Sequence, residues 1–171
     1  MDARSNFEWY TTVFGPFDPR RWDVVRRRYS AVVPLPLAVG AVCETEEPRY
    51  CRLGAGAYVR RVARQGTEAT ISICPQFFRT TLAEAQLDPL YRSVWQLELY
   101  WAGVIVHELM HTHFLDTTSA HDNGYGLARV LKLSPEIAEN SADSYHVFAI
   151  LTHRSGEVPK CVRKPSRWRN C

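Results

Sequence analysis

The sequence predicts an α+β domain in which a small mixed or antiparallel sheet is followed by helices. β-rich runs lie before the middle of the chain and segments with helical periodicity lie after it, an order typical of this class. Of the 171 residues, 46% are hydrophobic and 23% are charged. This length suits one domain with its own core, and this composition argues against disorder. We therefore expect a single domain over residues 1–171.

The first 42 residues are expected to contain a helix and an extended segment. In "DPRRWDVVRRRYSAV" Asp18 can cap the helix and Pro19 suits its first position. One stripe of this helix carries Trp22, Val25 and Tyr29. The prolines of "VVPLPLAVG" then favour extended chain up to the first β-rich run.

A β-hairpin and two helical regions are expected in the rest of the chain. The runs "AYVRRVAR" and "EATISIC" on either side of Gly66 predict the hairpin. After "PQFFRTTLAEAQLDPLYRS", expected as loop and short helix, an apolar-periodic segment extends to Phe114. The last helix is expected to begin with Ser134 as N-cap and to break near Asn140. Its predicted inner stripe is Ile137, Tyr145, Phe148 and Leu151. Residues 155–171 form a basic tail.

Charge and cysteine content limit the partners and the compartment. The net charge is +3, and the basic residues cluster within 20–28 and 160–169 without a nucleic-acid-binding motif. We interpret these clusters as a solvated face and a tail, and expect no nucleic-acid partner. The longest apolar run, 99–106, is too short to span a membrane. The five cysteines lack a C-x-x-C pair and favour disulfides in an oxidising compartment. The first residues lack the apolar core of a signal peptide, so the protein is either cytosolic or a mature form whose leader is absent. Since the cysteines favour an oxidising compartment, we expect a secreted monomer.

The segment "HELMH" carries the strongest chemical signal. His107 and His111 are four residues apart, so on a helix both imidazoles lie on one face and can reach one cation. Zinc binds two such nitrogens and a third protein ligand, which leaves a position for water. Glu108 stands next to the first histidine, where its carboxylate can take a proton from that water. The sequence therefore predicts a zinc-dependent hydrolase.

The third zinc ligand has several candidates. A histidine six residues after His111 would indicate a metzincin, but that position is Thr117. A gluzincin would use a glutamate from a following helix, and Glu139 precedes Asp143 with the expected Glu-x-x-x-Asp spacing. The other candidates are two aspartates that follow the helix closely, Asp116 and Asp122. Asp116 is very near the helix end, whereas the stretch before Asp122 leaves room for the chain to return.

Three stretches resemble the aspzincins, a mainly fungal family of zinc proteases that includes deuterolysin and the peptidyl-Lys endopeptidases. The family pattern is HExxH followed by Gly-Thr-x-x-Asp-x-x-Tyr-Gly. "HELMH" and "TSAHDNGYG" resemble it with Asp122, Tyr125 and Gly126 in register, although Thr118 and Ser119 replace its Gly-Thr. "CPQFF" and "NSADSYHVFA" resemble the family elements CPxFF and NADSYALFA. The likeness covers residues 43–149, without residues 1–42 and the tail.

The resemblance implies a zincin-like fold and a role for each matching residue. His107, His111 and Asp122 would bind zinc, and Glu108 would be the general base and later the proton donor. Tyr125 would hydrogen-bond the oxyanion. Asp143 would either help select a basic substrate side chain or accept structural hydrogen bonds.

The resemblance also bears on the cysteines and the substrate. We expect a Cys51–Cys74 disulfide that staples the hairpin, and a second one between Cys161 and Cys171. A protein or peptide substrate would lie extended along an edge strand of the hairpin. Four histidines are not expected to bind the metal: His113, His121, His146 and His153. Two alternatives stay open: a gluzincin-type protease that uses Glu139, and an inactive effector or binding module on the same scaffold.

Overall fold

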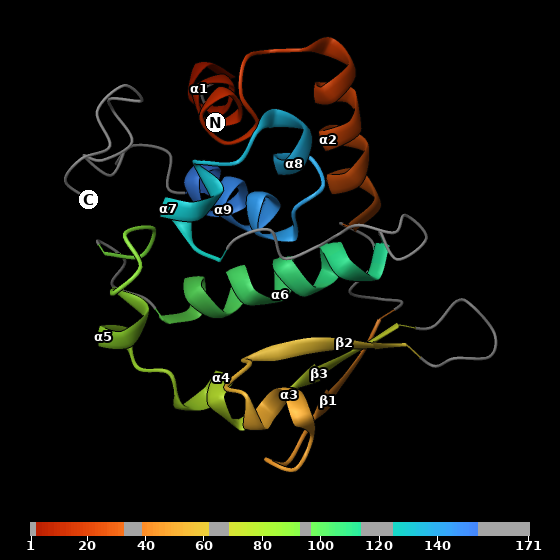
Figure 1. Ribbon diagram of the computed structural model, residues 1–171, viewed down its shortest axis with the longest axis vertical. Coiled ribbons are helices and arrows are strands. Elements are labelled where there is room, and N and C mark those ends of the chain that lie inside the picture. The colour runs from red at the N-terminus through yellow and green to blue at the C-terminus, as the bar shows by residue number, and fades with distance from the viewer. Residues whose placement is uncertain (1–2, 33–38, 62–68, 93–96, 114–124, 154–171) are drawn as a thin grey trace.

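A long helix in the middle of the molecule lies over a small sheet (Figure 1). The computed structural model of the protein describes residues 3–32, 39–61, 69–92, 97–113 and 125–153. The sheet has three strands in the order β1-β3-β2: β1 (Gly40–Cys43), β2 (Ala57–Arg61) and β3 (Ala69–Ile73). β1 pairs with β3 in parallel and β2 pairs with β3 antiparallel, so the sheet is mixed. The predicted hairpin is confirmed, and β2 is an edge strand.

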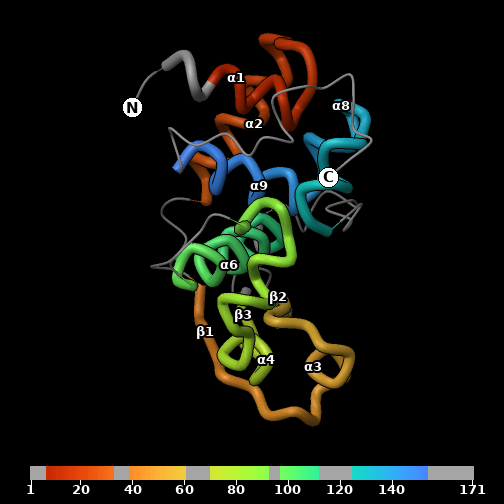
Figure 2. The backbone as a smooth tube through the Cα atoms, turned by 90° about the vertical axis from the view of Figure 1, so that its left-hand side faces the viewer, coloured from red at the N-terminus to blue at the C-terminus, as the bar shows by residue number. Residues whose placement is uncertain are grey.

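Helix α6 (Leu97–His113) separates the sheet from the helical half of the molecule. It packs against β2 and β3 on one side and against α9 (Ala142–His153) on the other. α1 (Ala3–Phe14) contacts α9, and α2 (Pro19–Val32) contacts α6; the view turned by 90° shows the same succession (Figure 2). α6 is therefore enclosed by structure on two sides, as its apolar sequence requires.

The chain begins with two helices where the sequence predicted one. α2 starts as expected: the Asp18 carboxylate accepts hydrogen bonds from the backbone N–H groups of Arg20 at 2.7 Å and Arg21 at 3.3 Å. α1 was not predicted. Its Phe14 is fully buried, with ring centroids 5.3 Å from Tyr145 and 5.6 Å from Phe148. Contacts with α9 stabilise this helix.

Short helices complete the described part of the chain. They are α3 (Arg49–Arg52), α4 (Pro75–Arg79), α5 (Leu82–Ala85), α7 (Leu127–Val130) and α8 (Pro135–Ala138). The predicted break near Asn140 is confirmed, because it separates α8 from α9. The inner stripe was wrong at Ile137, which is 44% exposed, since the two helices do not share one axis.

A disulfide ties α3 to the end of β3. Cys51 and Cys74 are bonded, which confirms the predicted pair, and Cys43 is a free, exposed thiol. Cys161 and Cys171 lie outside the described residues. None of the helices that the structure describes is long and apolar enough to cross a membrane.

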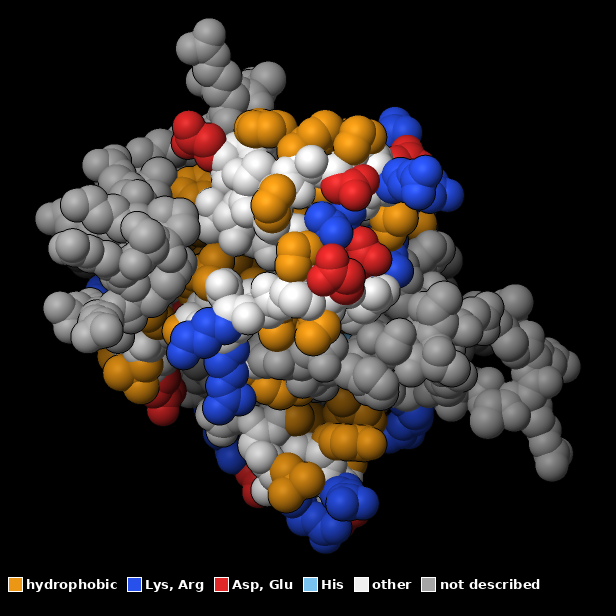
Figure 3. Space-filling model, turned by 45° about the horizontal axis from the view of Figure 1, so that its top comes forward, with side chains coloured by type: hydrophobic (Ala, Val, Ile, Leu, Met, Phe, Trp, Pro, Cys, Tyr) orange, Lys and Arg blue, Asp and Glu red, His pale blue; other side chains and the backbone are white. Residues whose placement is uncertain are grey.

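The basic cluster of α2 is largely matched by acidic groups. Arg26 and Arg27 pair with Asp23 on the same helix, and Arg21 pairs with Glu136 of α8. Acidic and basic side chains are interspersed on the face that comes forward when the top of Figure 1 is tilted toward the viewer (Figure 3). Arg26 and Arg27 are solvated, as interpreted from the sequence, whereas the Arg21 side chain is only 14% exposed.

Candidate metal centre and active site

Helix α6 brings two imidazole nitrogens to one point. Nε2 of His107 and Nε2 of His111 are 3.1 Å apart, one helical turn from each other. Two nitrogens bound to one tetrahedral zinc at ordinary bond lengths would be about 3.3–3.4 Å apart. His107 is 6% exposed and His111 is half-buried, so the pair lies at the bottom of an opening rather than on the surface. The two side chains fit a shared zinc ion.

A cavity of about 710 Å³ opens over this histidine pair. Its lining includes the predicted base Glu108, which is 6% exposed, and the predicted oxyanion donor Tyr125. It also includes Ala57, Tyr58 and Val59 of β2, together with the turn that precedes this strand. Cavities of this volume are typical of ligand-binding sites. The cavity thus joins the helix that carries the predicted chemistry to an open strand edge.

Asp143 connects the histidine helix to α9. Its Oδ1 accepts hydrogen bonds from Nδ1 of His107 at 3.2 Å and from Nδ1 of His146 at 3.1 Å. Burial alone would raise the pKa of the Asp143 carboxyl, but the hydrogen bonds that the two histidines donate lower it below its ordinary value. An ionised carboxylate is an acceptor for both rings. The bond to His107 leaves Nε2 of that ring directed toward His111.

Gly126 lets the segment after Tyr125 reach the same carboxylate. Its backbone N–H donates to Oδ2 of Asp143 at 2.5 Å. Gly126 has φ of +83°, and a Cβ there would lie 2.7 Å from Oδ2 of Asp88, so only glycine fits this turn. Tyr125 is 60% exposed, and its ring stacks on the His107 ring with centroids 5.8 Å apart. Asp143 therefore anchors both the histidine helix and the tyrosine segment.

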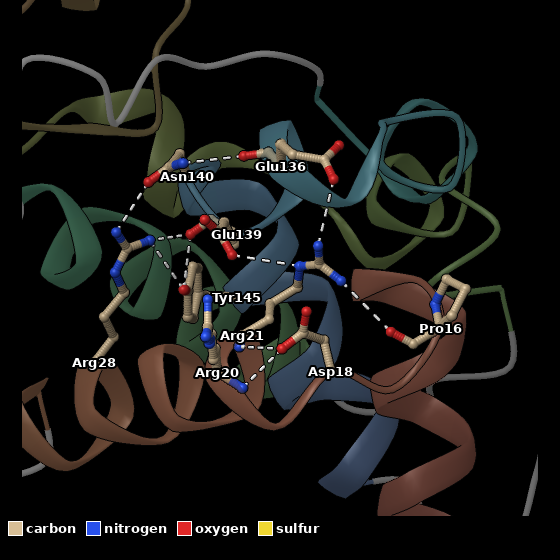
Figure 4. Close-up of polar contacts among 9 residues, drawn as sticks. All are labelled: Pro16, Asp18, Arg20, Arg21, Arg28, Glu136, Glu139, Asn140 and Tyr145. Carbon is tan, nitrogen blue, oxygen red and sulfur yellow. Dashed lines mark hydrogen bonds and ion pairs between the residues drawn. The ribbon is translucent and has the colours of Figure 1, made fainter.

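Glu139, the alternative third ligand, belongs to another network. Its carboxylate pairs with Arg21 at 3.4 Å, and its backbone oxygen accepts hydrogen bonds from Arg28 and from the Tyr145 hydroxyl (Figure 4). Glu139 is absent from the described residues that line the cavity. This network connects α2 to the junction of α8 and α9. The Glu139 carboxylate is therefore engaged with α2 and not with the histidine pair.

Several predicted positions lie outside the described residues. They are Asp116, Thr117, Thr118, Ser119, His121 and Asp122. The described segments end at the last turn of α6 and resume at Tyr125, so they bracket this stretch on both sides. Asp122 therefore stays a prediction as the third ligand.

Sequence reasoning missed two residues next to the site. His146, for which the sequence suggested no role at the site, contacts Asp143 through Nδ1 and the Tyr91 hydroxyl through Nε2. It stands three residues after Asp143, so helical spacing could have placed both on one face. The tyrosine gave no signal, because it lies 55 residues from His146. His107, Asp143 and His146 each offer a potential ligand atom, all within 4.8 Å of one another, so a second arrangement for a metal has to be considered.

The helix-borne histidines, the adjacent carboxylate and the open strand edge form the arrangement expected of a metallopeptidase. The family described as lysine-specific metallo-endopeptidase matches residues 1–150, including the first 42 residues, which the motifs had left uncovered. The chain belongs to this family, the aspzincins, and is a zinc-dependent metalloendopeptidase. This confirms the resemblance, the hydrolase class and the zinc cofactor.

A solved structure supports the fold. The zinc peptidase from Grifola frondosa is similar to this chain with a TM-score of 0.58 and 21% sequence identity. The similarity covers 89% of this chain and 86% of that one. No curated protein matches the sequence. The α+β metallopeptidase fold expected from the sequence is confirmed.

Proposed function

We propose that His107, His111 and Asp122 hold the zinc ion with which this protein cleaves peptide bonds. The observation that carries the proposal is the 3.1 Å separation of the two Nε2 atoms, which fits a shared metal. A zinc ion in such a site acts as a Lewis acid and makes a water molecule nucleophilic near neutral pH. Asp143 would bind no metal in this arrangement. It would accept the hydrogen bond that Nδ1 of His107 donates. This role agrees with the hydrogen bonds that both of its carboxylate oxygens already accept.

Glu108 and Tyr125 are the proposed proton-transfer and oxyanion-binding residues. Glu108 follows His107 directly and lines the cavity, so its carboxylate can take the proton of the attacking water and later donate it to the leaving amine. Tyr125 stands against the His107 ring, where its hydroxyl can donate a hydrogen bond to the negative charge that develops on the carbonyl oxygen. Both side chains line the cavity in which the peptide substrate would bind.

The substrate is proposed to lie along β2. One side of this strand is paired with β3, and its residues 57–59 line the cavity. An extended peptide can add to such an edge through main-chain hydrogen bonds. Of the two strands of the predicted hairpin, only β2 is an edge strand and can pair with a substrate, because β3 lies between β1 and β2. We propose that the protein acts in an oxidising, extracellular compartment, which the Cys51–Cys74 disulfide supports.

A preference for basic substrate residues is proposed from the charge of the cavity. Three carboxylates line it, those of Asp88, Glu108 and Asp143, and no lysine or arginine is among its described lining residues. Asp143 is 3% exposed and both of its oxygens accept hydrogen bonds, so the preference would come from the summed negative potential. This differs from selection of a basic side chain by direct pairing with Asp143.

Cleavage of a peptide library tests activity, metal dependence and preference together. We expect cleavage that a zinc chelator abolishes and that added zinc restores, with lysine and arginine enriched at one position next to the cleaved bond. Raising the salt concentration should weaken this enrichment, because a potential from several carboxylates is screened. Cleavage without enrichment of basic residues would contradict the charge argument. It would leave the peptidase assignment intact.

The third ligand can be decided with two single variants. Asp122→Ala is expected to lose stoichiometric zinc and to lower kcat/KM by about 100-fold or more, because the open site would retain only two protein ligands. Glu139→Gln is the matched control and is expected to keep its zinc, since its carboxylate pairs with Arg21. Zinc content is measured by atomic absorption after dialysis. The reverse result, zinc retained in Asp122→Ala and lost in Glu139→Gln, would establish a gluzincin-type site.

A further inference from the structure

We propose that Tyr91 and His146 form a positioning pair that orients Asp143 and, through it, the zinc ligand His107. The inference rests on the proposed zinc site and extends it by two residues that do not contact the metal. His146 lies on helix α9 and contacts the buried Asp143 carboxylate, and the Tyr91 hydroxyl contacts the other ring nitrogen of His146. The pair determines the orientation of the Asp143 carboxylate.

Hydrogen-bond complementarity determines the direction of each bond in the chain. An ionised Asp143 can only accept, so Nδ1 of His146 must carry a proton to donate to Oδ1. In a neutral His146 ring Nε2 is then an acceptor, and the Tyr91 hydroxyl donates to it. Tyr91 therefore selects the His146 tautomer that donates to Asp143. The three side chains are buried, at 1%, 8% and 3% exposure for Tyr91, His146 and Asp143.

Gly103 shows that the active-site helix is built around this pair. It stands inside α6, one turn before His107, although glycine is less favourable than alanine in a helix interior. A Cβ at this position would overlap the Tyr91 hydroxyl oxygen and lie 2.5 Å from Nε2 and 2.8 Å from Cδ2 of His146. The close approach of the pair to the helix backbone thus requires a glycine.

The pair affects the metal by restricting the Asp143 carboxylate. Oδ1 is shared between His107 and His146, and Oδ2 accepts from the Gly126 N–H. Loss of the His146 donor removes one of these three restraints, so the carboxylate can turn and the His107 ring loses its fixed orientation. Such outer partners of metal ligands typically change metal affinity by about 10–100-fold.

Zinc affinity in the absence of substrate is the decisive measurement. It is obtained on the full chain by competition with a chromophoric chelator. His146→Ala is expected to weaken zinc binding by roughly tenfold and Tyr91→Phe by a smaller factor, about threefold, because the tyrosine acts one bond further away. His146→Asn is expected to restore most of the affinity, since its side-chain amide can donate from the place of Nδ1. Rescue by this variant separates hydrogen bonding from packing.

Two matched controls account for nonspecific effects. His153→Ala removes an exposed histidine from the same helix α9. Tyr10→Phe removes the hydroxyl of a buried tyrosine of α1 that is absent from the described lining of the cavity. Both should bind zinc as the unmodified protein does. His146→Ala or Tyr91→Phe with unchanged zinc affinity would overturn the proposal, and Tyr91→Phe keeps the ring packing if His146→Ala does not fold.

Gly103→Ala provides a second, independent measurement. Alone, it should weaken zinc binding as much as His146→Ala, because the new Cβ displaces the pair. Added to a Tyr91→Phe/His146→Ala background it should cause no further loss, since the clashing atoms are gone. Additive losses would contradict the steric coupling between the helix and the pair.

The outcomes also separate this proposal from the proposed zinc site. If His107→Ala retains zinc, the site itself is wrong; if only that variant loses zinc, the site holds and the positioning pair fails. Binding of a second zinc ion that His146→Ala abolishes would show that His107, Asp143 and His146 form a metal site, and would overturn the hydrogen-bonded assignment.

Discussion

Glu108→Gln is expected to lower kcat/KM for peptide cleavage by about 10²–10⁴-fold while zinc binding stays unchanged. The glutamine keeps the shape of the side chain but cannot take a proton from water. Glu108 is buried in the cavity wall next to His107, so no other carboxylate of α6 can replace it there. Steady-state kinetics on a fluorogenic peptide and zinc analysis of the same sample check both parts of this expectation.

Glu98→Gln is the control for this variant, because Glu98 lies in the first turn of the same helix and is exposed. Its activity should equal that of the unmodified protein. The Glu108 variant also tests the inactive-module alternative. If a biological effect of the protein survives Glu108→Ala with zinc still bound, hydrolysis is not the source of that effect.

His107→Ala is expected to abolish zinc binding and activity together. His107 supplies one of the two converging nitrogens and is the ring that Asp143 orients. Because Lewis-acid stabilisation contributes several kcal/mol to the transition state, activity should fall by about 10³-fold or more. Zinc content per chain, measured after dialysis, and residual peptide cleavage check the result.

The unmodified protein, stripped of metal by a chelator, should recover activity when zinc is added, whereas His107→Ala should not. His153→Ala, which removes an exposed histidine, should behave as the unmodified protein. If His107→Ala still binds stoichiometric zinc, the metal centre lies elsewhere in the chain and the assignment is wrong.

Local sequence patterns predicted the elements that carry the chemistry. The i,i+4 spacing of His107 and His111 and the apolar residues before them predicted a helix, which α6 confirms. Alternation of β-rich residues predicted the hairpin, and Asp18 before Pro19 predicted the start of α2. Each of these features depends on residues close together in the chain, so the physical cause is already present in the sequence.

The patterns failed where stability comes from distant contacts. α1 was not predicted, because its aromatic side chains become informative only when they pack on α9. Ile137 has a suitable spacing for the inner stripe but lies on a separate short helix and is exposed. Helical periodicity cannot show that a helix ends and a second one begins in another direction.

By itself the sequence determined the class of the reaction and the helix to which we assign it, because two imidazoles and a carboxylate within five residues depend only on helical spacing. The tertiary structure decided which other groups meet there. Packing of α9 against α6 directs Asp143 and His146 toward His107, and the β2–β3 pairing leaves the β2 edge open beside the cavity. These groups are far apart in the chain. Only burial in a common interior brings them within hydrogen-bonding distance.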